Sequence, residues 1–354
     1  MKQSATIAKT SATIGLLGLA FMLIGCTGDG TTFGHTTGAP ANGVFVIQNT
    51  PANGTSTAAA GSILEFSANA SGASSPVATI ANLNVTSLGF LAADGTGNVY
   101  TAATEGTAGT SLIEFPVGSQ NNAQPIRSIP FNGTTELTSI TGLAADTAGD
   151  LYASNSSGGV SIFTAAENGS TAPAGTVTTT SDTGPQATAV DTSGNLYIAP
   201  GVQVSQISTS TAPIEVFSPQ TSTTTPTRTI GGAATLMDIA TPQGLATDTA
   251  GNLYVANVAS GVSSILVFEP TASGNVPPMR DITGSNTQLG CVAGIAVDTE
   301  GGYIYIVSTP TCGSTVNPTI LKFSTTGDGN IAPISSFTSS AWTNPDPALS
   351  IAVY

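Results

Sequence analysis

Few side chains in this chain of 354 residues could carry out chemistry on a substrate. The only histidine is His35, so neither a Ser-His-Asp set nor a histidine cluster for zinc can be assembled. Cys291 and Cys312 have no histidine near them in the sequence, which argues against a zinc site there. We therefore predict no catalytic residue and no metal ligand. The remaining candidates could bind a polar ligand through carboxylate or amide groups, and they are Glu136, Asn155, Asp238, Gln243 and Asn257.

The composition favours an acidic all-β protein. Only 7% of the residues are charged, where about 25% is usual, and short apolar runs alternate with glycine, proline, serine and threonine. The formal net charge is −14. If Lys2 and Lys9 are removed with the leader described below, four basic residues remain against 20 acidic ones, a net charge of −16. Such a field repels nucleic acid, so we expect no nucleic-acid partner.

The chain opens with MKQSATIAKTSATIGLLGLAFMLIGC, which has the features of an export signal. Lys2 and Lys9 precede a short apolar run over 14–24, which is too short for a comfortable membrane span. The end of the run, Leu-Ile-Gly-Cys, resembles the lipobox of bacterial lipoproteins. That resemblance implies that Cys26 is acylated and becomes the mature N-terminus, and Thr27 in place of aspartate implies release to the outer membrane. An ordinary secretory leader with an incidental cysteine is the alternative.

Three segments follow from the composition and from this resemblance. Residues 1–25 are expected to be a lipoprotein signal peptide, 26–42 a flexible Gly/Thr-rich tether, and 43–354 the folded domain. The expected location is the bacterial cell envelope, with the lipid on Cys26 as the contact with the membrane. We expect a monomer.

Three short phrases recur through the folded domain. The first is an apolar run ending in aspartate, then a glycine turn and a tyrosine; GLAADTAGDLYASN and GLATDTAGNLYVAN are nearly identical copies. Its aspartates lie 45 to 57 residues apart, at Asp94, Asp146, Asp191, Asp248 and Asp298. The second phrase is a short run that ends at Phe66, Phe115, Phe163, Phe217, Phe268 and Phe323. The third follows a loop and starts at Pro76, Pro125, Pro173, Pro226, Pro278 and Pro333.

Each cycle predicts four short strands, called a (GLATD), b (NLYVAN), c (ILVF) and d (MRDI). Aspartate and glycine between a and b suit a tight hairpin. The b strand is apolar almost throughout, as expected for a sheet that is covered on both faces. A four-stranded unit of about 50 residues that is repeated radially indicates a β-propeller blade. A shared turn structure explains the repeated aspartate, and a calcium site at each turn is the alternative.

The run GLATDTAGNLYVAN…ILVFEP resembles the NHL repeat, which is found in six-bladed propellers, and the resemblance covers about residues 43–354. The c and d phrases each occur six times, but the complete a phrase occurs five times. The chain ends in LSIAVY, with Tyr354 at the aspartate position, and NGVFVI supplies a b strand with Phe45 at the tyrosine position. We therefore predict an all-β, six-bladed propeller closed by pairing of its N- and C-terminal strands, which removes free sheet edges.

Two cysteines flank the fifth a–b hairpin. Cys291 precedes strand a, Cys312 follows strand b, and the hairpin turns at 298–302. Antiparallel pairing about this turn brings the two cysteines close together. We therefore predict a disulfide at the open end of the hairpin, which an exported protein can form.

Propellers usually bind ligands where the d–a and b–c loops surround the channel, and the b–c loops of this chain differ greatly in length. The five candidates named above are expected near that channel mouth. The favoured hypothesis is a binding or scaffold module for a protein or a small ligand. A surface coat protein without a small ligand is a third possibility.

A calcium-dependent lactonase or hydrolase is the alternative from another class. Gluconolactonase-type propellers hold calcium with Glu, Asn and Asp at the channel centre, and the resemblance would assign that role to Glu136, Asn155, Asp238 and Asn257. Peptide-amidating lyases also resemble the repeat, but they need histidines for zinc, which this chain lacks. Convergence of carboxylate and amide oxygens at the channel mouth would favour the hydrolase.

Overall fold

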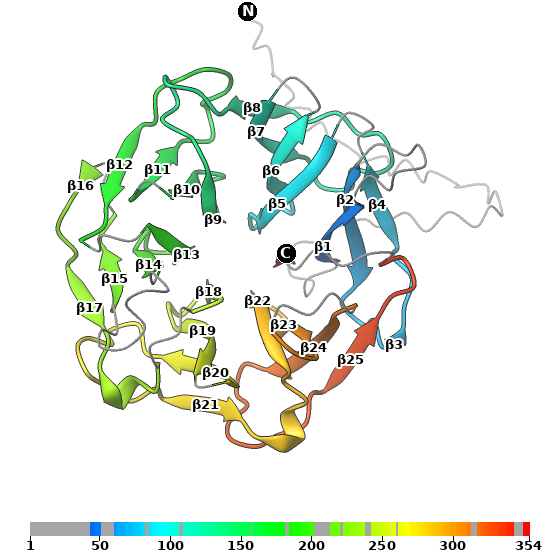
Figure 1. The fold of residues 1–354 in the computed structure, drawn as a ribbon, viewed down its shortest axis with the longest axis vertical. Helices are drawn as coiled ribbons and strands as arrows, with labels where there is room; N and C mark the ends of the chain where they lie inside the picture. Colours follow the sequence, from blue (N-terminus) through cyan, green and yellow to red (C-terminus); the bar gives the residue numbers. More distant parts are fainter. Residues whose placement is uncertain are drawn as a thin grey trace, which may run out of the picture. The chain divides into compact units, whose positions relative to one another are not determined.

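The first strand of the domain pairs with the last strand of the chain, and this pairing closes a ring of six sheets. β1 (Gly43–Thr50) runs antiparallel to β26 (Ile351–Val353), with Phe45 opposite Ala352. In the computed structural model, the sheets stand as blades around a central axis, and β1 lies near the C-terminus (Figure 1). The predicted all-β fold, with six blades and closure by the two terminal strands, is confirmed.

The structure describes residues 43–50, 60–81, 85–105, 109–156, 158–180, 184–201, 213–219, 222–237, 242–259, 261–312, 317–342 and 350–354. All of them belong to one compact unit, Thr37–Tyr354. The leader, Cys26 and the tether lie outside these ranges, as does Asp238.

Blades 1 to 3 follow the predicted a-b-c-d order. Blade 1 contains β5 (Val85–Ala93), β6 (Val99–Glu105), β7 (Gly109–Phe115) and β8 (Arg127–Pro130). Blade 2 contains β9 (Ile140–Ala145), β10 (Leu151–Asn155), β11 (Gly159–Phe163) and β12 (Gly175–Thr178). Blade 3 contains β13 (Pro185–Val190), β14 (Leu196–Pro200), β15 (Ile214–Phe217) and β17 (Arg228–Ile230).

Blades 4 to 6 complete the ring. Blade 4 contains β18 (Gly244–Thr247), β19 (Leu253–Ala259), β20 (Val262–Phe268) and β21 (Arg280–Thr283). Blade 5 contains β22 (Cys291–Asp298), β23 (Tyr303–Thr309), β24 (Thr319–Ser324) and β25 (Ser335–Thr338). Blade 6, the closing blade, contains β26, β1, β2 (Ala60–Ser67) and β4 (Ala78–Ala81). Two 3-10 helices, η2 (Ala233–Thr235) and η3 (Ser285–Thr287), precede blades 4 and 5.

The repeated aspartate stabilises the a–b turns through hydrogen bonds. In blade 4 the Asp248 carboxylate accepts hydrogen bonds from the Asn252 backbone N–H at 2.9 Å and from the Tyr254 hydroxyl at 2.9 Å. The tyrosines of blades 1, 2 and 3 donate in the same way to Asp94, Asp146 and Asp191. In blade 5, where the tyrosine follows one residue later, Tyr305 donates instead to the Ala68 carbonyl of blade 6. A structural role therefore accounts for the recurrence of this phrase.

The apolar core lies between the blades. The six c-strand phenylalanines are at most 2% exposed, and each packs against the neighbouring blade as well as its own. Phe163 of blade 2, for example, shares one cluster with Leu112 and Ile129 of blade 1. Burial of an aromatic side chain of this size contributes several kcal/mol, so each of these phenylalanines stabilises the contact between two blades.

Neighbouring blades are also joined at their outer edges, which the repeats did not predict. The d strand of one blade pairs in parallel with the c–d loop of the next. β12 of blade 2 pairs with β16 (Ser222–Thr223), and β25 of blade 5 pairs with β3 (Gly72–Ala73). Single parallel bridges link Ile80 to Asn121, Ile230 to Gly274 and Ile282 to Gly329. These bonds satisfy part of the outer edge that would otherwise be exposed.

Candidate functional site

The six a strands surround a cavity at the centre of the ring, with a volume of about 260 Å³. Each of β5, β9, β13, β18, β22 and β26 contributes residues to its wall. Small residues occupy equivalent wall positions where the strands converge. A Cβ on Gly244 would lie 3.0 Å from the Ile295 side chain of blade 5, so the glycine of the GLATD phrase favours close packing of neighbouring a strands.

Blade 1 departs from this pattern at Phe90. The residue has φ 55° and lies where the register between β5 and β6 shifts, between Gly89 and Leu91. A left-handed conformation is unusual for a bulky residue and is typical of a bulge that redirects a side chain. Phe90 is half-buried and forms part of the cavity wall, where it supplies an aromatic group.

The polar part of the wall consists of amide and hydroxyl side chains. Gln186 belongs to β13 and Thr141 to β9, whereas Gln243 directly precedes β18 and Ser350 directly precedes β26. The Leu91 backbone N–H donates to the Ser350 hydroxyl oxygen at 2.8 Å, which ties blade 6 to blade 1. Among the described residues of the wall, none carries a charged side chain.

The structure separates the five candidates predicted from the sequence. Gln243 lines the central cavity. Glu136 and Asn155 belong to blade 2, and Asn257 belongs to blade 4, but none of these three is part of the described cavity wall. Asp238 lies outside the described residues.

The side chains of Asn155 and Asn257 form hydrogen bonds within their own blades. The Asn155 amide donates to the Ser161 hydroxyl at 2.9 Å, and its carbonyl accepts from the Thr138 backbone at 3.4 Å. Asn257 is 1% exposed and donates to the Ser264 hydroxyl at 3.1 Å. Both side chains therefore join strands b and c within one blade.

Glu136 projects from the loop before β9. Its backbone is left-handed, with φ 58°, directly after Thr135, which is fully buried and donates its hydroxyl to the Pro130 carbonyl. Leu236 and Gln288 have the same conformation after the buried Thr235 and Thr287. A buried threonine therefore anchors each of these three d–a loops, and the following side chain is exposed.

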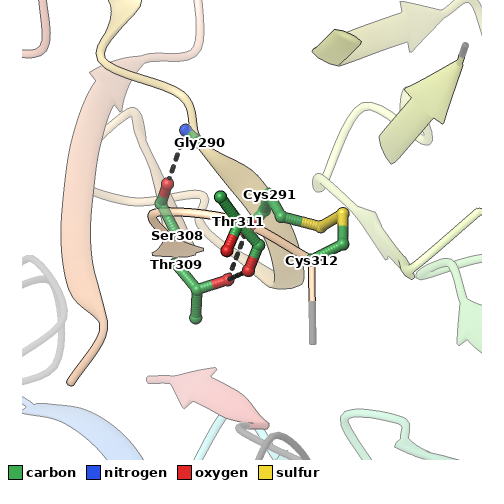
Figure 2. The surroundings of a disulfide bond; sticks show 6 residues. All are labelled: Gly290, Cys291, Ser308, Thr309, Thr311 and Cys312. Carbon is green, nitrogen blue, oxygen red and sulfur yellow. Dashed lines mark hydrogen bonds between the residues drawn. A yellow bond between two sulfur atoms is a disulfide. The ribbon is translucent and has the colours of Figure 1, made fainter. Parts of the chain in front are cut away.

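A disulfide joins Cys291 and Cys312 at the open end of the blade 5 hairpin, with their Cα atoms 4.9 Å apart (Figure 2). Cys291 pairs directly with Thr309 in the sheet, so Cys312 reaches it from just beyond the end of β23. The Thr309 hydroxyl donates to the Cys291 carbonyl at 3.2 Å (Figure 2). The bond therefore secures the start of β22, the strand that brings Ala293 and Gly294 to the cavity wall.

The chain resembles known proteins in its fold, but no family could be assigned to it. No family model and no curated protein matches the chain. A protein of unknown function from Bacteroides caccae superposes with a TM-score of 0.55 at 9% identity, covering 89% of this chain and 99% of that one. A chain of a nidogen/laminin complex superposes with a TM-score of 0.53 at 14% identity, covering 88% and 97%. At these identities the likeness extends to the propeller fold alone.

Two further structural findings concern membranes and metals. Within the described ranges, no helix is long and apolar enough to cross a membrane. Within the same ranges, no group of three or more His, Cys, Asp or Glu side chains lies together as a metal site would require. The donors that do meet at the channel are amides and hydroxyls, which suit hydrogen bonding to an uncharged polar molecule.

Sequence reasoning missed Gln186, Thr141, Ser350 and Phe90. Each lies within two residues of the a-strand glycine position, and that regular position was the available signal. The sequence-based prediction placed the site in the loops, whereas the cavity wall is formed largely by the a strands.

Proposed function

We propose that this protein is a binding module of the bacterial envelope that takes a small, uncharged polar ligand in its central channel. The observation that carries the proposal is the composition of the channel wall: Gln186, Gln243, Thr141 and Ser350 supply hydrogen-bonding groups, and Phe90 adds an aromatic surface. Ligand sites typically combine such apolar surface with a few convergent polar groups. The cavity is smaller than the roughly 300–1,000 Å³ of drug-sized pockets, which favours a compact ligand.

The electrostatics of the channel support an uncharged ligand. The protein carries a formal net charge of −14, so anions are repelled from its surface. A bound cation would need carboxylate partners, and the described channel wall provides none. A carboxylate-ligated calcium ion is therefore poorly matched to this wall, and the binding function is favoured over the hydrolase.

Ligand-observed NMR with neutral monosaccharides and their carboxylated derivatives tests the proposal. Neutral sugars should bind and the carboxylated ones should not. Gln186→Leu should weaken binding about three- to tenfold, as expected for one lost hydrogen bond. Gln124→Leu, which removes an exposed amide from the c–d loop of blade 1, is the matched control. Unchanged binding to the Gln186→Leu variant would show that the ligand does not bind in the central channel.

We further propose that the lipid on Cys26 holds the domain at the outer membrane, with the acidic propeller projecting from the bilayer on the 26–42 segment. The support is the lipobox-like end of the leader and the negative charge of the domain, which does not favour adsorption to anionic lipid. Cys26→Ser should move the protein from the membrane fraction to the soluble fraction. Intact mass of the wild-type protein should show an acylated N-terminus at Cys26, and an unmodified one would refute the anchor.

A further inference from the structure

A cation fills the outer part of the interface between blades 1 and 2. Arg127, on strand d of blade 1, is 5% exposed and lies 3.8 Å from Glu114 of the same blade. Its guanidinium donates to three backbone carbonyls of blade 2: Glu167 at 2.7 Å, Gly149 at 3.0 Å, and Thr164. These carbonyls follow the a–b turn and the c strand, so equivalent carbonyls recur in the other blades in which a turn joins strands a and b.

A cation also bridges to the next blade at two other interfaces. Arg228, on strand d of blade 3, donates to the Ala272 carbonyl of blade 4 at 3.1 Å and lies 5.7 Å from the centre of the Tyr197 ring. Lys322 of blade 5 donates to the Ala68 carbonyl of blade 6 at 3.0 Å and lies 5.4 Å from the Tyr305 ring centre. At these two interfaces a cation therefore lies near both a backbone carbonyl of the next blade and the b-strand tyrosine of its own blade.

The interface between blades 2 and 3 lacks this cation. The repeat position of Arg127 and Arg228, two residues after the d-strand proline, is occupied by Gly175 in blade 2. A cavity of about 520 Å³ opens beside it. Its wall includes Gly194 and Ser218 of blade 3, which hold the repeat positions of Gly149 and Thr164, the carbonyl acceptors that bind Arg127.

The tyrosine of this interface is correspondingly open. Tyr152 forms part of the cavity wall and is 9% exposed, whereas Tyr100, Tyr197, Tyr254 and Tyr305 are each at most 1% exposed. The ring that would face a cation, as Tyr197 faces Arg228, is therefore present in the cavity wall.

The cavity also has an additional negative charge. Asp150 lies in its wall at a turn position where blades 1, 3 and 4 have Asn98, Asn195 and Asn252. The Asp150 carboxylate accepts the Ala165 backbone N–H at 2.7 Å, as the Asn98 amide oxygen accepts Val117 in blade 1. Burial raises the pKa of Tyr152, and the carboxylates of Asp146 and Asp150 raise that pKa further, so both charges act on the ring that lines the cavity.

We propose that the cavity between blades 2 and 3 binds a guanidinium group from outside the chain. The group would occupy the place that Arg127 fills one interface earlier. It would donate to the carbonyls of Gly194 and Ser218, lie against the Tyr152 ring and neutralise Asp150. A guanidinium is favoured over a simple ammonium because its planar, multiple donors match several carbonyls at once, as those of Arg127 do. This site is separate from the central channel, so it does not depend on the function proposed there.

Saturation-transfer NMR on the purified protein, with ethylguanidinium as the probe and ethylurea as an uncharged probe of the same shape, tests the site. Ethylguanidinium should bind at least tenfold more tightly than ethylurea. Gly175→Arg supplies the missing side chain and should abolish binding of the probe. Equal binding of the two probes, or unchanged binding to a folded Gly175→Arg variant, would overturn the proposal.

A second variant covers the case in which Gly175→Arg does not fold. Asp150→Asn restores the residue of the other blades and can still accept the Ala165 N–H. It should weaken ethylguanidinium binding about two- to fivefold, as for a partly exposed ion pair. Glu136→Gln removes the same charge from a distant loop and should leave binding unchanged, and equal effects of both variants would contradict a specific site.

A capped Gly-Arg-Gly peptide separates two sources of the group. Binding of the peptide at least as tightly as ethylguanidinium supports a partner protein's arginine as the natural occupant. Binding of ethylguanidinium alone supports a free small molecule. Failure of both to bind would refute the site.

Discussion

The ring of Phe45 stacks on the ring of Tyr354, with their centroids 5.5 Å apart and their planes 21° apart. Phe45 faces Ala352 in the sheet as Tyr152 faces Ala144, so the two rings occupy the positions of the tyrosine and aspartate of the other blades. The closing blade thus replaces a hydrogen bond by an aromatic contact. The Tyr354 ring also reaches the Gly97 turn of blade 1, where a Cβ would approach it within 2.6 Å. Tyr354 therefore contacts Phe45 within the closing blade and the Gly97 turn of blade 1.

Tyr354→Ala should lower the free energy of unfolding by about 2 kcal/mol, because a half-buried aromatic ring and its stacking partner are lost. Urea denaturation measures this loss. The double variant Phe45→Tyr/Tyr354→Asp rebuilds the pair found in the other blades and should be more stable than Tyr354→Asp alone. An unchanged midpoint for Tyr354→Ala would show that the closure does not depend on this contact.

Tyr197→Phe should cost about 2 kcal/mol at neutral pH, because the hydroxyl donates to the Asp191 carboxylate at 3.2 Å and accepts from Arg228 at 3.1 Å. Burial, followed by the charge of Asp191, raises the pKa of Tyr197 to about 12. A raised folded-state pKa gives stability that is complete below the unfolded value, near 10, and is lost as the pH rises toward 12. The difference in stability between wild type and Tyr197→Phe should therefore shrink over that window, and a constant difference would contradict the assignment.

Arg127→Ala should destabilise the protein by about 3–5 kcal/mol, because it removes the bonds to three carbonyls and leaves Glu114 buried without its cation. Burial raises the pKa of Glu114, and Arg127 opposes that rise. In the variant the pKa should rise further, so acidification that protonates Glu114 should recover part of the stability. Arg127→Met/Glu114→Gln, which removes both charges, should be more stable than Arg127→Ala at neutral pH when measured by thermal unfolding.

Reduction of the Cys291–Cys312 disulfide should lower the free energy of unfolding by about 3 kcal/mol, from the chain entropy of a loop closed across 21 residues. Denaturation with and without dithiothreitol measures the effect. The Cys291→Ser/Cys312→Ser variant should match the reduced protein and should not respond to dithiothreitol. A wild-type protein whose stability is insensitive to the reductant would show that the bond does not form.

The polar wall of the channel could be predicted only in part. Gln243 and Thr141 stand directly before the two nearly identical copies of the phrase, yet they differ in residue type, and Gln186 and Ser350 belong to weaker copies. Asn155 and Asn257 lie in the b strands, and each forms a hydrogen bond to strand c of its own blade. Position in a repeat indicates the strand, whereas the neighbour across the axis decides which side chains share a cavity.

The sequence by itself determined the number of blades, the order of their strands and the joining of the two ends, because each blade needs the same turn, the same apolar strands and the same buried rings. Tertiary structure alone decided what lies between blades. Arg127 and Gly175 hold the same repeat position, yet one fills an interface and the other borders a cavity, since the partners of that position come from the next blade. Local residue patterns record contacts within a repeat, and contacts across repeats depend on the packing of the whole ring.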